Sequence, residues 1–268
     1  MLPFPVNYLF EEGLFEGEAI APQWKNNPYR YLRLHFMNPA PTLSLEDSLK
    51  YVALAMIGAA LGFFVIRQAL LYAGISLLTL VVFAYYHRDR WRVFGQWGGV
   101  ANGLTALRGL LLLGLVVGSD SLPHYAFLVL GILVLVVDGL DGYYARKYDT
   151  VSTFGDVFDK EVDALFVLTF GVLIVDKQLA GSWILLPGLL RYGYVVGLSL
   201  LARRPSPTGK SFRRQFVGMW LMGTLLAPFV LPSVVYQPAL IFAASIVSLS
   251  FVADFYQALR GQRVKVET

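Results

Sequence analysis

Long apolar segments constrain the fold of this 268-residue chain more than any other feature of its sequence. Eight of them approach or reach the roughly 17–25 residues that an α-helix needs to cross a hydrocarbon core about 30 Å thick. The first two are short and closely spaced, so a buried hairpin that does not fully cross is an alternative for that pair. The sequence predicts an all-α integral membrane protein. The segments lie at approximately 51–66, 69–86, 103–118, 123–146, 157–175, 182–202, 215–232 and 238–257.

The overall composition agrees with a membrane protein. Hydrophobic residues make up 56% of the chain and charged residues only 15%, which is too apolar for a soluble domain of average usage. Cysteine is absent, which excludes disulfides, thiolate metal sites and cysteine nucleophiles. The N-terminus lacks the basic and apolar regions of a signal peptide, so we expect residues 1–49 to stay in the cytosol.

The distribution of lysine and arginine predicts how the chain is oriented. Residues 203–214 contain five of them, whereas 119–123 and 232–237 contain none. The positive-inside rule then places the basic loops and both termini in the cytosol, and we expect the cell (inner) membrane. Basic residues beside a bilayer also suit anionic headgroups, so topology alone explains any single one of them about as well as a ligand does.

Two aspartates lie near the end of one predicted helix, and two more lie near the start of the next. Asp138 and Asp141 are three residues apart, while Asp159 and Asp163 are four apart, and each spacing puts both carboxylates on one helix face. The linker 147–154 is short, so the two helices are antiparallel neighbours and the four carboxylates can converge. The first pair lies roughly 12 Å inside the end of its helix at 1.5 Å per residue. We therefore expect an acidic cluster below the cytosolic headgroups.

A carboxylate at that depth costs a few kcal/mol, so it is usually paired, protonated or bound to metal. One interpretation is a structural network of ion pairs with Arg146, Lys147 and Lys160. The other is a divalent metal site, because carboxylate oxygens without His or Cys favour Mg²⁺, Mn²⁺ or Ca²⁺ over zinc or copper. Two such ions can hold a diphosphate and stabilise charge as a phosphoryl oxygen leaves.

Small residues accompany the aspartates. Gly142, Ala145 and Gly155 leave room for a nucleotide to approach the backbone, although any one of them alone would indicate helix packing. Together these residues fill every fixed position of the pattern D-x2-D-G-x2-A-R-x8-G-x3-D-x3-D across 138–163. This stretch resembles the signature of the CDP-alcohol phosphotransferase (CDP-alcohol phosphatidyltransferase) family.

The resemblance implies a six-helix transmembrane bundle core, here with two additional N-terminal apolar helices. It also implies a usually dimeric enzyme that moves a phosphatidyl or phospho-alcohol group from a CDP-linked donor to an alcohol. A mixture of Arg and Trp after the second segment predicts an interfacial helix. The expected organisation is a cytosolic segment 1–49, a transmembrane hairpin 50–86, an interfacial amphipathic helix 87–102, the catalytic core 103–260 and a cytosolic tail 261–268.

The resemblance also assigns roles to residues. A second, weaker match in "NGLTALRG" places Asn102, Thr105 and Arg108 beside the site. Asp163 would complete the metal site and accept the proton of the alcohol, although a metal-bound carboxylate is a weak base because its pKa is lowered. Two Mg²⁺ ions are expected, with Mn²⁺ as a substitute. The metal ligands would be Asp138, Asp141, Asp159 and Asp163, and the CDP pocket would be Thr105, Asp138, Gly142, Ala145, Arg146 and Gly155.

Asp156 is a rival ligand, because it shares a helical stripe with Asp159 and Asp163. Spacing alone does not separate the three residues, and only the family pattern demotes Asp156. As a first-turn residue of its helix, it can instead complement the helix dipole.

The acceptor alcohol is predicted from basic residues after the signature. Arg191 lies in an apolar span next to Pro187, which can open the helix locally, and a buried arginine requires an anionic partner. A phosphate on the acceptor would meet this need, with Lys210, Arg213 and Arg214 attracting it from the loop. Glycerol 3-phosphate fits this requirement. The stretch "DGYYARKYDTVSTFG" resembles enzymes that make phosphatidylglycerophosphate, whereas "FDKEVDALF" departs from their pattern, which leaves the acceptor subclass open.

Three functions are compatible with these observations. The favoured one is Mg²⁺-dependent transfer from a CDP-alcohol, CDP-diacylglycerol above all, to a hydroxyl acceptor with release of CMP in phospholipid biosynthesis. The expected partners are this donor, the alcohol, the lipid bilayer and a second copy of the chain, with no nucleic acid. The alternatives are a multi-pass transporter with an acidic ion site and a non-catalytic scaffold. Ion pathways usually distribute charge across the bilayer, whereas here the aspartates gather at one face.

Overall fold

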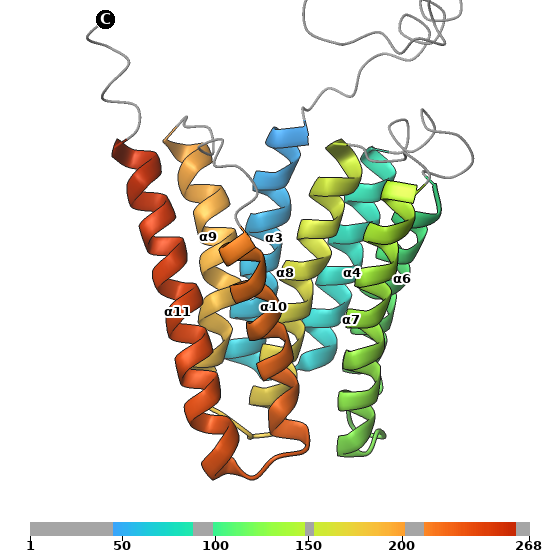
Figure 1. The fold of residues 1–268 in the computed structure, drawn as a ribbon, viewed down its shortest axis with the longest axis vertical. Helices are drawn as coiled ribbons and strands as arrows, with labels where there is room; N and C mark the ends of the chain where they lie inside the picture. The colour runs from blue at the N-terminus through green and yellow to red at the C-terminus, as the bar shows by residue number, and fades with distance from the viewer. Residues whose placement is uncertain (1–44, 88–98, 148–152, 202–211, 261–268) are drawn as a thin grey trace, which may run out of the picture. The chain divides into compact units, whose positions relative to one another are not determined.

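The computed structural model describes residues 45–87, 99–147, 153–201 and 212–260. This part of the chain forms eight α-helices and two short 3-10 helices (Figure 1), which confirms the predicted all-α class. The elements are α3 (Leu45–Ile66), α4 (Ala69–Tyr86), α6 (Gly99–Val117), α7 (His124–Lys147), α8 (Thr153–Asp176), η3 (Ser182–Leu185), α9 (Leu186–Leu200), α10 (Phe212–Leu226), η4 (Ala227–Phe229) and α11 (Ser233–Arg260).

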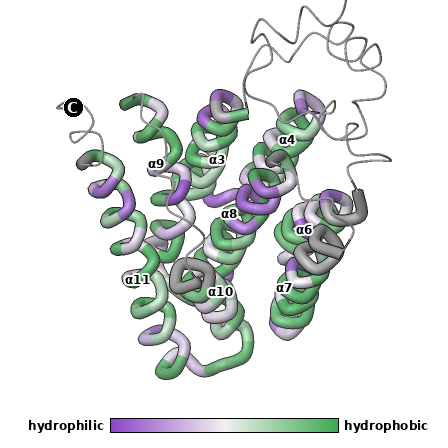
Figure 2. Tube along the Cα trace, turned by 45° about the horizontal axis from the view of Figure 1, so that its top comes forward, coloured by the Kyte–Doolittle hydropathy of each residue, from purple (hydrophilic) through white to green (hydrophobic). Residues whose placement is uncertain are grey.

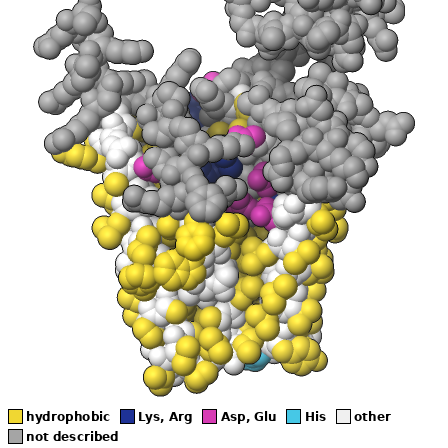
Figure 3. Space-filling view, viewed as in Figure 1, with side chains coloured by type: hydrophobic (Ala, Val, Ile, Leu, Met, Phe, Trp, Pro, Cys, Tyr) yellow, Lys and Arg dark blue, Asp and Glu magenta, His cyan; other side chains and the backbone are white. Residues whose placement is uncertain are grey.

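Most of these helices are apolar enough to lie in a membrane. Four stretches are long and apolar enough to cross one, and three shorter apolar helices accompany them. Hydrophobic side chains cover the lower part of the face seen in Figure 3, while the acidic and basic side chains in view lie above them. Exposed apolar surface of this extent indicates contact with lipid. The spans are 47–66, 69–86, 182–200 and 233–259, and the shorter helices are 102–117, 124–140 and 216–229.

The helix bounds agree with the predicted segments to within several residues. Both α3, with 22 residues, and α4, with 18, are long enough to cross a bilayer. The expected interfacial helix at 87–102 lies largely outside the described residues, and α6 already begins at Gly99. Pro187 does not open a helix internally. It lies in the first turn of α9, where its missing N–H removes no helical hydrogen bond.

Helix α8 is the centre of the bundle, because it packs against α3, α4, α6, α9 and α10. From Val162 onward its side chains are almost all buried, with Leu165, Phe166 and Leu168 fully inaccessible. A helix that is apolar on all sides requires neighbours on all sides. Figure 2 shows that hydrophilic positions gather toward one end of α8, while the rest of the helix is hydrophobic.

Helix α7 approaches α8 and α10 closely at Gly131. A Cβ atom on this glycine would lie 2.8 Å from Cζ of Phe170 and would also collide with Cδ2 of Leu226, so no larger residue fits without movement of these side chains. Val134 and Asp138 follow Gly131 at three and seven residues, which places them on the same face of α7. The close contact at Gly131 thus directs Asp138 toward α8.

The two N-terminal helices are joined to the same bundle. The hydroxyl groups of Tyr72 in α4 and Thr169 in α8 lie 3.0 Å apart in the interior. At the end of the bundle, Ser48 Oγ lies 2.8 Å from Nε2 of the buried His87, whose ring also packs against Phe154. These contacts hold the start of α3, the end of α4 and the start of α8 together.

Candidate active site

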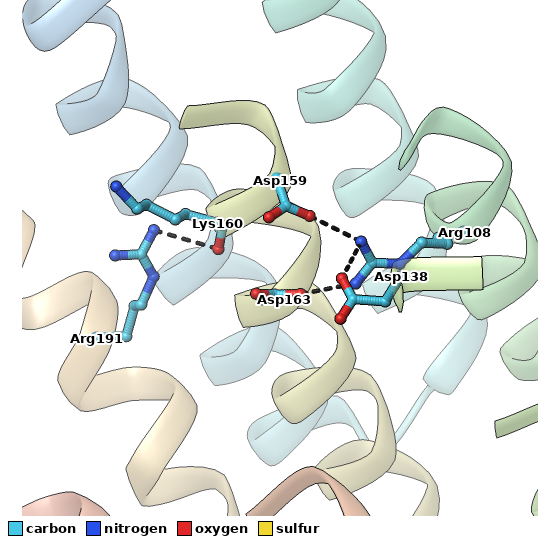
Figure 4. A network of polar contacts seen from close by, with 6 residues as sticks. All are labelled: Arg108, Asp138, Asp159, Lys160, Asp163 and Arg191. Carbon is cyan, nitrogen blue, oxygen red and sulfur yellow. Dashed lines mark hydrogen bonds and ion pairs between the residues drawn. The ribbon is translucent and has the colours of Figure 1, made fainter. Parts of the chain in front are cut away.

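Three aspartates converge on one buried arginine (Figure 4). Nη1 of Arg108 lies 2.6 Å from Oδ1 of Asp138 and 2.8 Å from Oδ1 of Asp159. Nη2 of the same arginine donates to Oδ1 of Asp163 at 2.7 Å. The Arg108 side chain is 0% exposed, whereas the aspartate side chains are 31%, 39% and 34% exposed in the same order. The arginine therefore closes the cluster on its inner side, and the carboxylates remain accessible.

The helices explain this convergence. Asp159 and Asp163 are one turn apart on α8, and Asp138 lies on the same face of α7 as Gly131, where an added Cβ would meet the side chain of Phe170 from α8. Helix α6 packs against both α7 and α8. On α6, Thr105, Arg108 and Leu112 are all buried at spacings of three and four residues, so they form one inward-facing stripe. Arg108 is thereby placed between the two helices that carry the aspartates.

The carboxylates fit a divalent cation. One oxygen from each of Asp138, Asp159 and Asp163 lies within 4.8 Å of the others, a spacing that one ion with metal–oxygen bonds of roughly 2.0–2.6 Å can bridge. The donor set is entirely oxygen, which suits Mg²⁺, Mn²⁺ or Ca²⁺. The fourth predicted ligand, Asp141, belongs to α7 one turn after Asp138, and its side chain lies outside the described residues.

The remaining predicted residues lie around the same helix ends or outside the described part. Thr105 is buried on α6 one turn before Arg108, and Gly155 is half-buried in the first turn of α8. Lys210 lies outside the described residues. Of the others only the helical backbone is described, in the last turns of α7 or the first turn of α10. They are Gly142, Ala145, Arg146, Arg213 and Arg214.

The rival ligand Asp156 is not in the cluster. Lys160 donates to Oδ2 of Asp156 at 2.6 Å, and both side chains are about half exposed. Of the network considered from the sequence, Lys160 pairs with Asp156, and among the described residues Arg108 is a cation that contacts all three clustered aspartates. The side chains of Arg146 and Lys147, the other two members of that network, lie outside the described residues.

Arg191 has an acidic partner that sequence reasoning missed. Its Nη2 donates to Oε1 of Glu161 at 2.6 Å and to the backbone carbonyl of Lys160 at 3.3 Å. The Glu161 side chain is 4% exposed and that of Arg191 24%. The predicted need for an anion was correct, yet a protein carboxylate already meets it. The sequence did indicate this partner, because Glu161 is a further acidic residue at nearly the same depth along the helix as the aspartates.

The fold and the site together define a multi-pass membrane protein with an acidic cluster toward one end of its helix bundle. The model of the CDP-alcohol phosphatidyltransferase family matches residues 99–256, which include α6 to α10 and nearly all of α11. The chain belongs to the CDP-alcohol phosphatidyltransferase family.

Curated relatives carry one name, CDP-diacylglycerol--glycerol-3-phosphate 3-phosphatidyltransferase. The chain is similar to the Bacillus subtilis protein with 37% identity over 89 residues, covering 32% of this chain and 46% of the relative. It is similar to the Treponema pallidum protein with 32% identity over 125 residues, covering 47% and 50%. The chain thus spans about half the length of the curated relatives it matches. No solved structure matches.

Proposed function

We propose that this protein transfers a phosphatidyl group from a CDP-alcohol, specifically CDP-diacylglycerol, to a hydroxyl acceptor and releases CMP in phospholipid biosynthesis. The observation that supports this most directly is the convergence of three carboxylates within 4.8 Å, inside the segment that matches the family. In the reaction, the acceptor oxygen forms a new bond to the phosphorus that carries the lipid. The bond from that phosphorus to CMP breaks, and the hydroxyl proton leaves to a base.

The aspartates would hold the metal. Asp138, Asp141, Asp159 and Asp163 are the ligands we propose for two Mg²⁺ ions, with Mn²⁺ as a substitute. Bound cations of this kind stabilise negative charge on a diphosphate and its leaving oxygen. Asp163 bonds to Arg108 through Oδ1, and we assign its second oxygen to the proton of the acceptor hydroxyl.

The donor nucleotide would lie against the ends of α6, α7 and α8. Thr105 and Asp138 provide polar groups there, and Gly155 leaves space beside the backbone of α8. Positions in the last turns of α7 complete this proposed pocket. They are Gly142, Ala145 and Arg146.

The acceptor we propose is a phosphorylated alcohol, and glycerol 3-phosphate is the first candidate. Both bonds of Arg191 among the described residues use Nη2, so its Nη1 and Nε are suited to bind a phosphate. The curated relatives carry glycerol 3-phosphate in their names. Lys210, Arg213 and Arg214 would add positive charge at the cytosolic side. Pairing with Glu161 stabilises Arg191 without any substrate, so burial of this arginine no longer argues for the acceptor by itself.

We also propose how the helices are divided, how the protein assembles and how it is oriented in the membrane. Helices α6 to α11 would form the six-helix core, with α3 and α4 as the additional pair. The core would act as a homodimer in the cell (inner) membrane. The basic segment 203–214 supports a cytosolic site and cytosolic termini.

Release of CMP by the purified protein tests this function. The assay would supply CDP-diacylglycerol with glycerol 3-phosphate, inositol phosphate, serine or choline in turn, with Mg²⁺ or after chelation. We expect metal-dependent CMP release with a phosphorylated acceptor. Ion flux through reconstituted protein without any CMP release would instead indicate a transporter. Good turnover with choline or serine would contradict the acceptor class but not the reaction.

A further inference from the structure

Arg108 is in an unusual electrostatic position, because one fully buried guanidinium contacts three carboxylates from two other helices. We propose that Arg108 is a built-in counter-ion that holds these aspartates together with or without a divalent cation and, at the same time, weakens the binding of that cation. This inference rests on the metal site proposed above. Arg108 itself is not one of the proposed metal ligands or acceptor-binding residues.

Arg108 lowers the electrostatic cost of the acidic cluster. Three carboxylates at one point in an apolar bundle repel one another, and they would separate or take up protons without positive charge between them. Arg108 supplies one positive charge to Asp138, Asp159 and Asp163. Among these four described side chains a net charge of two negative units remains. Arg108 thus makes the cluster tolerable in the bundle but does not neutralise it, and the remaining negative charge would still attract divalent cations.

Arg108 also fixes the orientation of the three carboxylates. Arg108 contacts Oδ1 of all three aspartates, at 2.6, 2.8 and 2.7 Å. A planar guanidinium with fixed donor directions orients carboxylates more strictly than a lysine ammonium would. A divalent cation held by the same carboxylates would lie within several ångströms of the guanidinium, where the two positive charges repel. The arginine therefore organises the ligands and opposes the ion.

These two effects predict opposite changes when the charge is removed. Arg108→Met keeps the length and apolar stem of the side chain but leaves three carboxylates without their cation. In chelator, we expect its melting temperature to fall by roughly 5 °C or more, while the wild type remains folded. Mn²⁺ should raise the melting temperature of the variant more than that of the wild type. Mn²⁺ should also bind the variant on the order of tenfold more tightly.

The experiment is a titration of detergent-purified protein with Mn²⁺, followed by thermal unfolding and by the electron paramagnetic resonance signal of free Mn²⁺. Arg108→Lys is the matched control, because it keeps the charge and should bind Mn²⁺ much as the wild type does. If Arg108→Met does not fold in chelator, Arg108→Met/Asp159→Asn removes one negative charge as well and should recover folding. Recovery by this second change, or by Mn²⁺, supports the proposal.

Three outcomes decide between the ideas. A folded Arg108→Met variant that binds Mn²⁺ no more tightly than the wild type overturns the counter-ion role. Failure of both Mn²⁺ and Asp159→Asn to recover folding overturns it too, because the arginine would then have a purely structural function. Absence of Mn²⁺ binding to the wild type itself would instead refute the proposed metal site, and the proposed function with it.

Discussion

Glu161 accepts a 2.6 Å hydrogen bond from Arg191 across the contact between α8 and α9. Glu161 lies two residues from both Asp159 and Asp163, so its side chain leaves α8 on nearly the opposite face. Figure 4 shows the result, with Arg191 and Arg108 on opposite sides of α8. One short stretch of helix thus supports two separate charged groups, an acidic cluster toward α6 and α7 and an ion pair toward α9.

The ion pair predicts a stability effect that is not additive. Arg191→Met should leave Glu161 buried without its cation and cost about 3–5 kcal/mol, as breaking a buried pair typically does. Arg191→Met/Glu161→Gln should cost much less, because no uncompensated charge remains. Denaturation of the single and double variants in the same detergent measures both effects. Equal losses in the single and double variants would contradict the importance of the pair.

The double variant also separates the structural role of Arg191 from its proposed role in acceptor binding. In the folded Arg191→Met/Glu161→Gln protein, we expect the KM for glycerol 3-phosphate to rise roughly tenfold or more, as expected for a lost charged hydrogen bond. The KM for CDP-diacylglycerol should change little. Steady-state CMP release with each substrate varied in turn measures the two constants. An unchanged KM for glycerol 3-phosphate would limit Arg191 to the ion pair.

The proposed metal ligands can be tested against a matched aspartate. Asp138→Asn, Asp159→Asn and Asp163→Asn should each reduce CMP release by at least about 100-fold, because each removes a charged ligand while keeping the side-chain shape. Asp156→Asn is the control, since Asp156 pairs with Lys160 outside the cluster, and it should retain near wild-type activity. If Asp156→Asn lost most of its activity while one of the other three variants kept it, Asp156 would be a metal ligand instead.

Close packing at Gly131 predicts a position-dependent effect of adding one methyl group. Gly131→Ala should destabilise the protein by about 1–3 kcal/mol, because the new Cβ would collide with Phe170 and Leu226. Gly139→Ala in the same helix meets no atom within 4 Å and should be neutral or slightly stabilising. Unfolding measurements on both variants compare the sites. Equal stability of the two would indicate that α7 packs differently.

The absence of cysteine makes topology directly testable. Ser206→Cys, in a segment outside the described residues, should react with a membrane-impermeant thiol reagent only from the cytosolic side. Gly181→Cys, in the turn between α8 and η3, should react only from the opposite side. Labelling of intact cells and of inverted vesicles distinguishes the two. The reverse pattern would invert the proposed orientation.

Sequence spacing was informative where the chemistry lies within one helix or across a short turn. The intervals within 138–163 and the short linker are enough to expect the carboxylates to converge, and Asp138, Asp159 and Asp163 do lie together. The partners of these charges could not be predicted in the same way. Whether Arg108 faces α8, or whether Glu161 meets Arg191, depends on the rotation of helices whose paired residues lie 30 to 55 positions apart in the chain. The sequence pattern of one helix does not determine this rotation.

The central position of α8 has a consequence for how the protein is assembled. Among the described helices, α8 is not one of those long and apolar enough to be candidate membrane spans, and the charges near its start make its insertion costly. When α8 leaves the ribosome, α6 with Arg108 has already been synthesised, whereas α9 with Arg191 has not. We therefore expect α8 to be retained in the insertion machinery until both arginines are present, so that the order of synthesis, and not hydrophobicity, determines when α8 becomes a membrane helix.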